Sequence, residues 1–208
     1  MSCTKQTTYV AIWVGLDGFN DNTVEQTGIM AECENGKSVY SAWYEFYPNP
    51  SVTFDNIKVV PGDKIVAWVV YLLNKTFVTA LEEYNNNGLV FNRSSPATSV
   101  SDAERSSAEW IVERPSQCIG LSCNLTTLAN FGNVSFGDYF SEINRDYVVL
   151  SNGTSLPFGY LSKYLYNITM VNNNGGSPLA YVSWFNDISS FNVIYFTTAS
   201  KQVTHGHK

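Results

Sequence analysis

The stretch Val39-Tyr40-Ser41-Ala42-Trp43-Tyr44-Glu45-Phe46-Tyr47 alternates two kinds of side chain along its length. Positions 40, 42, 44 and 46 are apolar or aromatic, whereas the intervening positions include Ser41, Trp43 and Glu45. Because successive side chains of a β-strand point to opposite faces of the sheet, this pattern predicts a strand with one face in a core. Its other face carries polar and aromatic groups.

Short β-strand patterns recur along most of the chain without amphipathic helices between them. The run Ile65–Leu73 is almost continuously β-branched and aromatic, follows the turn signal Pro61-Gly62-Asp63, and predicts a central strand. Further strands are expected at 8–14, 76–80, 109–113, 134–136, 147–150, 164–170, 180–185 and 192–198. The Asn- and Gly-rich segments 85–88 and 172–176 predict hairpin turns, and the only helix expected is a short turn near 136–143.

This strand spacing predicts an all-β fold, namely an antiparallel β-sandwich of jelly-roll or concanavalin-like type. We expect two large curved sheets and minimal helix. A length of 208 residues suits one such unit, so residues 1–200 are predicted to form a single domain. Residues 201–208 are predicted to form a flexible polar C-terminal tail.

The charge balance argues against a nucleic-acid partner, since the chain has a formal net charge of −6 and no cluster of Lys or Arg. Protonation of all 18 carboxylates would leave 12 Lys and Arg plus 2 His, a charge of +14, which is modest for this length. Composition therefore suits either an acid-tolerant protein or a merely acidic secreted one. No apolar run in the sequence is long enough to span a membrane, so no membrane-spanning segment is expected.

The cysteines and sequons favour an extracellular protein. Cys118 and Cys123 flank a turn-like segment and are expected to form a disulfide, whereas the sequence leaves open whether Cys3 and Cys33 pair. Six Asn-x-Ser/Thr sequons suit a glycoprotein, and the polar first residues suggest a mature domain whose export signal has been removed. With only two histidines, both near the C-terminus, no metal is expected.

Two short strand-like segments offer a candidate reaction centre, Gln26 in 24–28 and Glu109 in 107–113. A carboxylate can take a proton from water, and an amide can donate a hydrogen bond to an oxygen that gains negative charge. Strand alternation also places Glu113 on the same face as Glu109, roughly 13 Å away at ~3.3 Å per residue, which is too far to share a proton. The pair could therefore hydrolyse a carbonyl bond without a metal or a Ser or Cys nucleophile.

Several ordered motifs of the chain resemble those of the glutamic peptidases (eqolisins). They are Trp13-Val14-Gly15-Leu16-Asp17-Gly18, Gln26-Thr27-Gly28, Ala42-Trp43-Tyr44-Glu45-Phe46-Tyr47-Pro48, Pro61-Gly62-Asp63 and Ser107-Ala108-Glu109-Trp110-Ile111-Val112-Glu113. Their order and spacing match those of the family. The resemblance runs from about Tyr9 to Phe136 and continues more weakly through the later strands.

The resemblance implies a secreted, acid-active endopeptidase built as a β-sandwich, made with a removable pro-segment and using a Gln/Glu dyad. By motif the catalytic pair falls on Gln26 and Glu109. The positions that line the family's substrate groove or support it fall on Trp13, Asp17, Trp43, Glu45 and Glu113. We therefore expect a monomer without cofactor that binds an extended polypeptide and, before processing, its own pro-segment.

Two other functions fit the same residues. A jelly-roll glycoside hydrolase would use Glu45 and Glu109 as its two carboxylates and would leave Gln26 without a necessary role. A non-catalytic, lectin-like carbohydrate-binding domain would use the same aromatic face without turnover.

Overall fold

The computed structural model describes residues 1–120, 122–137, 146–172, 176–184 and 189–196. The chain forms two compact units, one of Cys3–Ala129 with Met1 and one of Asn130–Lys208 with Ser2. The single domain at 1–200 stays a prediction. The tail predicted at 201–208 lies outside the described residues.

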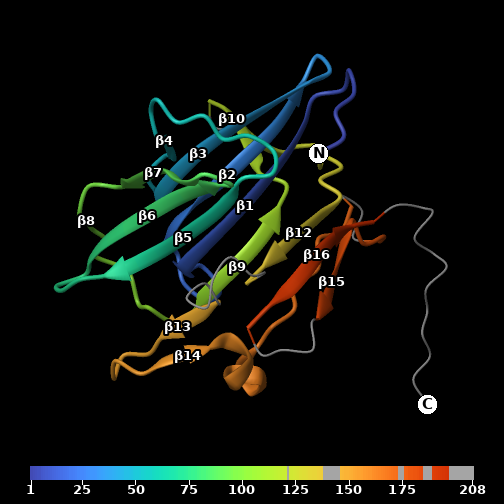
Figure 1. Cartoon of the computed structure of the whole chain (residues 1–208). Coiled ribbons are helices and arrows are strands. Elements are labelled where there is room, and N and C mark those ends of the chain that lie inside the picture. The colour runs from blue at the N-terminus through green and yellow to red at the C-terminus, as the bar shows by residue number, and fades with distance from the viewer. Residues whose placement is uncertain (121, 138–145, 173–175, 185–188, 197–208) are drawn as a thin grey trace. The chain divides into compact units, whose positions relative to one another are not determined.

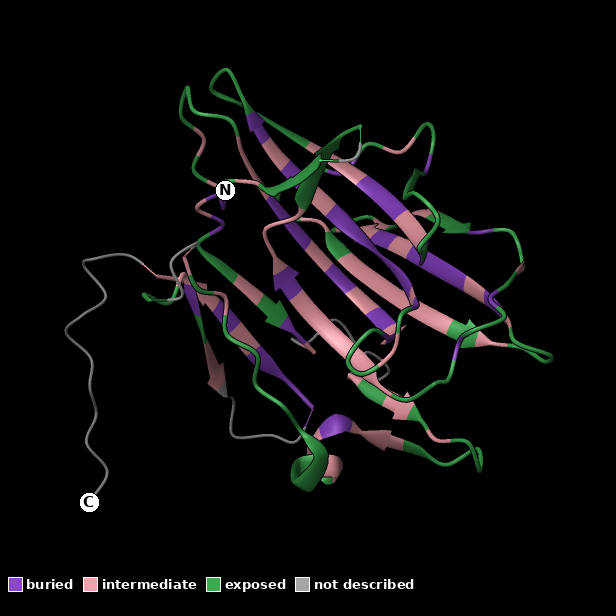
Figure 2. Cartoon of the chain, turned by 180° about the vertical axis from the view of Figure 1, so that it is seen from behind, coloured by how far each residue is buried: buried purple, intermediate pink, exposed green. Residues whose placement is uncertain are grey.

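The first unit contains a five-stranded antiparallel sheet in the order β4-β3-β2-β1-β9. Its strands are β1 (Thr8–Asp17), β2 (Val24–Glu34), β3 (Lys37–Tyr47), β4 (Val52–Thr53) and β9 (Ala108–Glu113). Figure 2 shows the alternation of burial along these strands. In β3 the apolar set behaves as predicted, since Ala42 and Phe46 are buried and belong to core clusters.

A second antiparallel sheet of the same unit packs against this one (Figure 1). It consists of β5 (Lys64–Tyr71), β6 (Thr76–Asn85), β7 (Gly88–Ser94) and the short β8 (Thr98–Ser99), which pairs with β6. Leu81 and Phe77 of β6 are fully buried, and they pack in clusters with Ala42 and Phe46 of β3, respectively. The predicted antiparallel all-β sandwich is confirmed.

The position of one strand within its sheet was predicted wrongly from its composition. The segment starting at Ile65 was predicted to be central, but β5 lies at the edge of its sheet, where it pairs with β6 alone. Val70 is 39% exposed, so a run of β-branched residues did not require burial on both faces. The predicted turn at 85–88 is confirmed, since Asn85 pairs with Gly88 between β6 and β7.

The second unit contains the sheet β12-β16-β15 and the hairpin β13-β14. Their bounds are β12 (Asn133–Phe136), β13 (Tyr147–Val149), β14 (Ser155–Pro157), β15 (Ala180–Trp184) and β16 (Phe191–Tyr195). Phe191 stacks on Phe136 with ring centroids 4.9 Å apart and meets Phe158 edge-on at 5.5 Å, which forms a small aromatic core.

The strand predicted at 164–170 is wrong. The 3-10 helix η1 (Phe158–Tyr164) ends at the residue where the strand was predicted to begin, and no strand follows up to Met170. Tyr166 and Ile168 are 72% and 66% exposed, so their spacing reflects no buried face. The predicted helical turn falls largely on 138–143 and the second predicted hairpin turn on 173–175, both outside the described residues.

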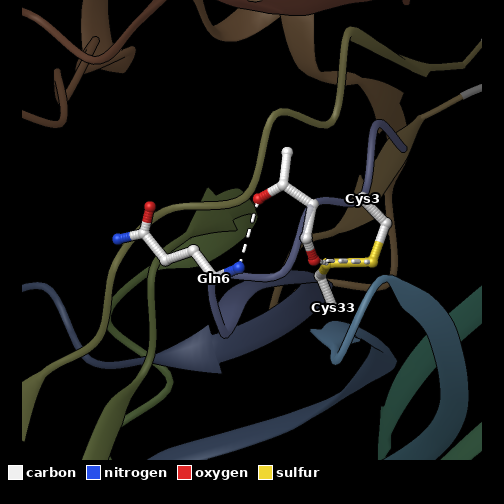
Figure 3. Close-up of a disulfide and its surroundings, with 4 residues drawn as sticks. Cys3, Gln6 and Cys33 are labelled. Atoms are coloured by element: carbon white, nitrogen blue, oxygen red, sulfur yellow. Dashed lines mark hydrogen bonds between the residues drawn. A yellow bond between two sulfur atoms is a disulfide. The ribbon is translucent and has the colours of Figure 1, made fainter.

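Two disulfides cross-link the first unit. Cys118 and Cys123 form the expected bridge within the hairpin of β10 (Ser116–Ile119) and β11 (Ser122–Leu125). Cys3 pairs with Cys33, which the sequence left open, and so ties the N-terminal segment to the end of β2 (Figure 3). Across the described residues, no helix is long and apolar enough to cross a membrane.

Candidate functional site

Gln26 and Glu109 face each other across a single strand. Gln26 of β2 lies opposite Gly15 of β1, and Gly15 lies opposite Glu109 of β9. Directly opposed residues of antiparallel strands point to the same face, so both functional side chains emerge from one face of the sheet in one row. The next residue in that row is Glu45, which lies opposite Gln26 on β3.

The gap between the pair follows from strand spacing and from Gly15. Adjacent strands lie ~4.8 Å apart, so the backbones of β2 and β9 are separated by roughly 10 Å at this row. Gly15 has no side chain to fill the interval. A Cβ there would lie 2.9 Å from Trp13 Cζ3 and 3.4 Å from Gln26 Cβ. The row therefore has no side chain at Gly15 between the amide and the carboxyl group, and the Trp13 ring reaches over this glycine.

Glu45 orients the amide of Gln26. Gln26 Nε2 donates a hydrogen bond to Glu45 Oε2 at 2.5 Å, and Gln26 is only 7% exposed. The amide oxygen of Gln26 is buried and has no hydrogen-bond partner in the described part of the chain. Since a primary amide has two N–H donors, one remains for another acceptor.

The carboxyl group of Glu109 is half-buried and favours its neutral form. Burial, with smaller contributions from the carboxylates of Asp21, Glu113 and Asp17, raises the pKa of Glu109 to about 7. The Ser107 hydroxyl, 3.4 Å from Glu109 Oε1, opposes this shift by donating to the charged form. This carboxyl can hold or release a proton in the range where ordinary carboxyls are ionised.

Two tryptophans line the row beside the pair, where Trp43 and Trp13 flank Gly28. Both indoles are 7% exposed. Trp13 Nε1 donates to Glu113 Oε1 at 3.1 Å, whereas the buried Nε1 of Trp43 has no partner among the described residues. Gly28 admits the Trp13 backbone, since a Cβ at Gly28 would lie 2.1 Å from the Ile12 carbonyl oxygen.

Burial raises the pKa of both flanking carboxyls. For Glu45, burial and the charge of Glu113 raise the pKa, while the hydrogen bond from Gln26 lowers it. For Glu113, burial raises the pKa and the hydrogen bond from Trp13 lowers it. The face of the sheet around the pair is therefore rich in carboxyl groups that favour the neutral form.

Asp17 is fully buried and holds the segment that leads into β9. Its oxygens accept hydrogen bonds from the backbone N–H groups of Ser106 at 2.6 Å and Glu104 at 3.1 Å. Burial, followed by the charge of Asp17, raises the pKa of the neighbouring buried Glu25 to about 8. Asp17 thus holds in place the backbone of residues 104–106, which leads into the strand that carries Glu109.

The structure brings Gln26, Glu109, Trp13, Trp43 and Glu45 onto one face, with Glu113 four residues beyond Glu109 along β9. Cys118 and Cys123 lie apart from this row in their own hairpin. In the described residues, no group of three or more His, Cys, Asp or Glu side chains is arranged to hold a metal ion.

Sequence reasoning missed Gly15, Asp21, Ser106 and Ser107. Asp21 lies in the polar turn 17–22, whose Asp, Gly and Asn residues signal side chain–backbone hydrogen bonds but do not reveal the partner loop. Gly15 gave no signal by itself, because its role depends on strand register.

Comparisons with known proteins agree with this geometry. The chain is 33% identical over 125 residues to aspergillopepsin-2 of Aspergillus niger, across 60% of this chain and 43% of that protein. It is 32% identical over 122 residues to scytalidopepsin B of Scytalidium lignicola, across 57% of this chain and 45% of that protein. The chain thus spans less than half the length of the curated relatives it matches.

Solved structures show the same fold. The crystal structure of aspergilloglutamic peptidase from Aspergillus niger superposes with a TM-score of 0.71 and 26% identity, over 91% of this chain and 99% of that one. Scytalido-glutamic peptidase, solved with a peptide-based transition-state analogue, gives a TM-score of 0.74 at 24% identity, over 94% of this chain and 87% of that one.

The model of the Peptidase A4 family matches residues 2–177, which is most of the chain. The resemblance predicted from the ordered motifs is thereby confirmed. The chain belongs to the peptidase A4 family, the glutamic peptidases.

Proposed function

We propose that this protein is a secreted, acid-active endopeptidase in which Glu109 activates water and Gln26 stabilises the oxyanion. The observation that carries the proposal is the row Gln26, Gly15, Glu109, which sets a hydrogen-bond donor and a proton acceptor on either side of a glycine. Family membership supports peptide hydrolysis as the reaction.

The proposed reaction needs one proton acceptor and one fixed donor. Ionised Glu109 takes a proton from a water molecule above Gly15, and the water oxygen bonds to the carbonyl carbon of the scissile peptide. The carbonyl oxygen, now negative, accepts a hydrogen bond from the free N–H of Gln26 Nε2, a contact worth ~3 kcal/mol or more when it is preorganised. The C–N bond then breaks as Glu109 returns its proton to the leaving nitrogen.

The raised pKa of Glu109 determines the pH range in which the proposed base is ionised. Below about 7 the fraction of ionised Glu109 falls in the free protein. Burial is the main cause of this shift, and the charges of Asp21, Glu113 and Asp17 add to it. An amide does not titrate in this range, so the oxyanion donor persists in acid. We therefore expect the ionisation of Glu109 to set the acid limb of the activity profile.

The substrate that suits this face is an extended polypeptide. The side chains of Trp13 and Trp43, which lie on the same face as the pair, would contact substrate side chains. We propose that the mature enzyme acts as a monomer without metal or cofactor, after removal of its pro-segment. The six sequons and two disulfides support a secreted glycoprotein.

Strand order disfavours the glycoside hydrolase. Glu45 and Glu109 lie on β3 and β9, three strand spacings or roughly 14 Å apart at the backbone. Retaining glycosidases place their carboxyls about 5 Å apart and inverting ones about 6.5 to 9.5 Å. Glu45 is also bound to Gln26, which a glycosidase would not require.

The decisive experiment measures cleavage of an unfolded protein between pH 2 and pH 7 by the wild type, Gln26→Ala and Glu109→Gln. Each variant is first checked for folding by circular dichroism. Both should lose activity by at least about a hundredfold. Gln6→Ala and Glu104→Gln are matched controls at exposed side chains, the first beside the Cys3–Cys33 bridge (Figure 3), and should retain it. Retained activity in folded Glu109→Gln would refute the dyad, and a folded wild type without proteolysis would favour the lectin-like alternative.

A further inference from the structure

The Glu109 carboxyl is enclosed by two loops, of which the family motifs cover only Gly18 and Ser107. One is the turn 18–23 between β1 and β2, and the other is the segment 104–107 that precedes β9. A Cβ built on Gly18 would lie 3.5 Å from both carboxyl oxygens of Glu109. The turn at Gly18 therefore packs directly against the group proposed to activate water.

Asp21 links these two loops. Its Oδ1 accepts a hydrogen bond from the backbone N–H of Gly18 at 2.8 Å, and its Oδ2 accepts one from the Ser106 hydroxyl at 2.5 Å. Burial raises the pKa of Asp21, but the hydrogen bonds from Ser106, Gly18 and Thr23 outweigh it and hold the pKa below its usual value. Asp21 is thus a carboxylate whose ionised form is bound from both loops.

Further contacts continue from this link toward Glu109. The backbone N–H of Asp17 donates to the Ser107 carbonyl at 3.0 Å, and the Phe19 N–H donates to the Ser107 hydroxyl at 3.4 Å. That hydroxyl lies 3.4 Å from Glu109 Oε1 and donates to it. A change in the distance between the loops would therefore move both the serine donor and the turn that contact the carboxyl.

We propose that Asp21 is a positioning residue, which aims the Glu109 carboxyl by fixing the turn at Gly18 to the segment at Ser106. The inference rests on the proposed function for its kinetic consequence and on the described contacts for its geometry. Asp21 touches neither water nor substrate in this role. Its effect passes through Gly18 and Ser107.

The kinetic test compares Asp21→Ala and Ser106→Ala with the wild type on a peptide substrate. A positioning role predicts that kcat falls roughly tenfold to a hundredfold in Asp21→Ala and less in Ser106→Ala, while KM changes less than about twofold. Asp102→Ala removes an exposed carboxylate from the same β8–β9 connection and should keep wild-type kcat. If Asp21→Ala does not fold, Ser106→Ala, which removes one hydroxyl, carries the test.

A second readout does not depend on turnover. The carboxyl 13C signal of Glu109, identified by its loss in Glu109→Gln, is titrated by NMR in each variant. Asp21, Asp17 and Glu113 are the charged groups that act on Glu109, so Ser106→Ala, which keeps the charge of Asp21, is the informative variant. If the link positions Ser107, its hydrogen bond to Glu109 should weaken in Ser106→Ala and the titration midpoint should rise, because that bond lowers the pKa. Asp102→Ala should leave it unchanged.

The outcomes separate the two proposals. Retained proteolysis in Glu109→Gln defeats the dyad and leaves the NMR titration to decide the role of Asp21. An inactive Glu109→Gln together with a folded Asp21→Ala that keeps wild-type kcat and a Ser106→Ala with an unchanged Glu109 titration overturns the positioning role alone. A loss of kcat that only mirrors a smaller folded fraction overturns it as well.

Discussion

Gln26 donates its side-chain amide to Glu45 at 2.5 Å, from a position directly opposite Glu45 in the register of β2 and β3. The bond turns Nε2 toward Glu45, because an ionised carboxylate accepts hydrogen bonds and offers no donor to the amide oxygen. The amide oxygen stays buried without a partner. Glu45 therefore keeps the second N–H of Gln26 available in the direction of Gly15.

Replacing Glu45 tests this relationship. Glu45→Ala removes the acceptor and should lower kcat by roughly tenfold or more, because the amide can then rotate away from the oxyanion position. Glu45→Gln retains an acceptor oxygen and should lose less. Glu34→Ala, at an exposed carboxylate of the neighbouring strand β2, is the control. Equal activity of Glu45→Ala and the wild type, measured on folded protein with one peptide substrate, would contradict this role.

Gly15 should tolerate a methyl group structurally but not functionally. The nearest atom to an added Cβ is Trp13 Cζ3 at 2.9 Å, which belongs to a side chain that can shift. Gly15→Ala should cost about 1 to 3 kcal/mol of unfolding free energy, measured by urea denaturation, and should displace the Trp13 ring beside the pair. We expect activity to fall at least about a hundredfold.

Gly28→Ala provides the contrast. Its Cβ would lie 2.1 Å from a backbone oxygen, which cannot yield without displacing β1, so this variant should fail to fold. A folded Gly15→Ala with wild-type kcat would show that the interval between Gln26 and Glu109 does not hold the reacting water.

The strands were predictable where one face of the sheet is buried by apolar residues, as in β3. The same reasoning recovered only the start of β2, although Ile29, Ala31 and Cys33 are buried in alternation along the rest of that strand. It missed β7, an edge strand whose Leu89 and Val90 are about half exposed. An alternation of apolar residues marks a strand that buries one face. A polar strand or an edge strand does not show this alternation.

The candidate site residues were named as members of motifs, but their arrangement required strand order. Nothing in the sequence states that β1 separates β2 from β9, and hence that Gly15 lies between Gln26 and Glu109. The contacts of Asp21 were equally hidden, since Ser106 lies 85 residues away in the chain. Both the position of Gly15 and the contacts of Asp21 depend on pairing between residues far apart in the chain, which local sequence patterns do not reveal.

Stability should decline as the pH rises from acid to neutral. The folded-state pKa is raised from 4.5 to about 8 for Glu25 and to about 7 for Glu83 and Glu109, chiefly by burial. Raised carboxyl pKa values mean that the native state binds more protons than the unfolded state above pH 4.5, so the free energy of unfolding falls with rising pH. The stabilisation is complete below about pH 4.5 and is lost as the pH passes through about 8.

Urea midpoints at pH 4, 6 and 8 measure this decline. Glu25→Gln, which stays neutral at every pH, should flatten the profile, whereas Glu34→Gln at an exposed site should leave its slope unchanged. Equal midpoints at pH 4 and pH 8 for the wild type would show that these carboxyls are not held neutral by the fold.

The two disulfides should contribute unequally to stability. Cys3 and Cys33 are 30 residues apart, and Cys118 and Cys123 are 5 apart. In the chain-entropy description, a loop of the first size stabilises the fold by about 3 to 4 kcal/mol and one of the second by about 2 kcal/mol. Replacing both cysteines of each pair by alanine and measuring urea denaturation at pH 4 gives the two losses. A larger loss from the 118–123 pair would mean that native-state contacts of that hairpin, rather than restriction of the unfolded chain, determine what its bridge contributes.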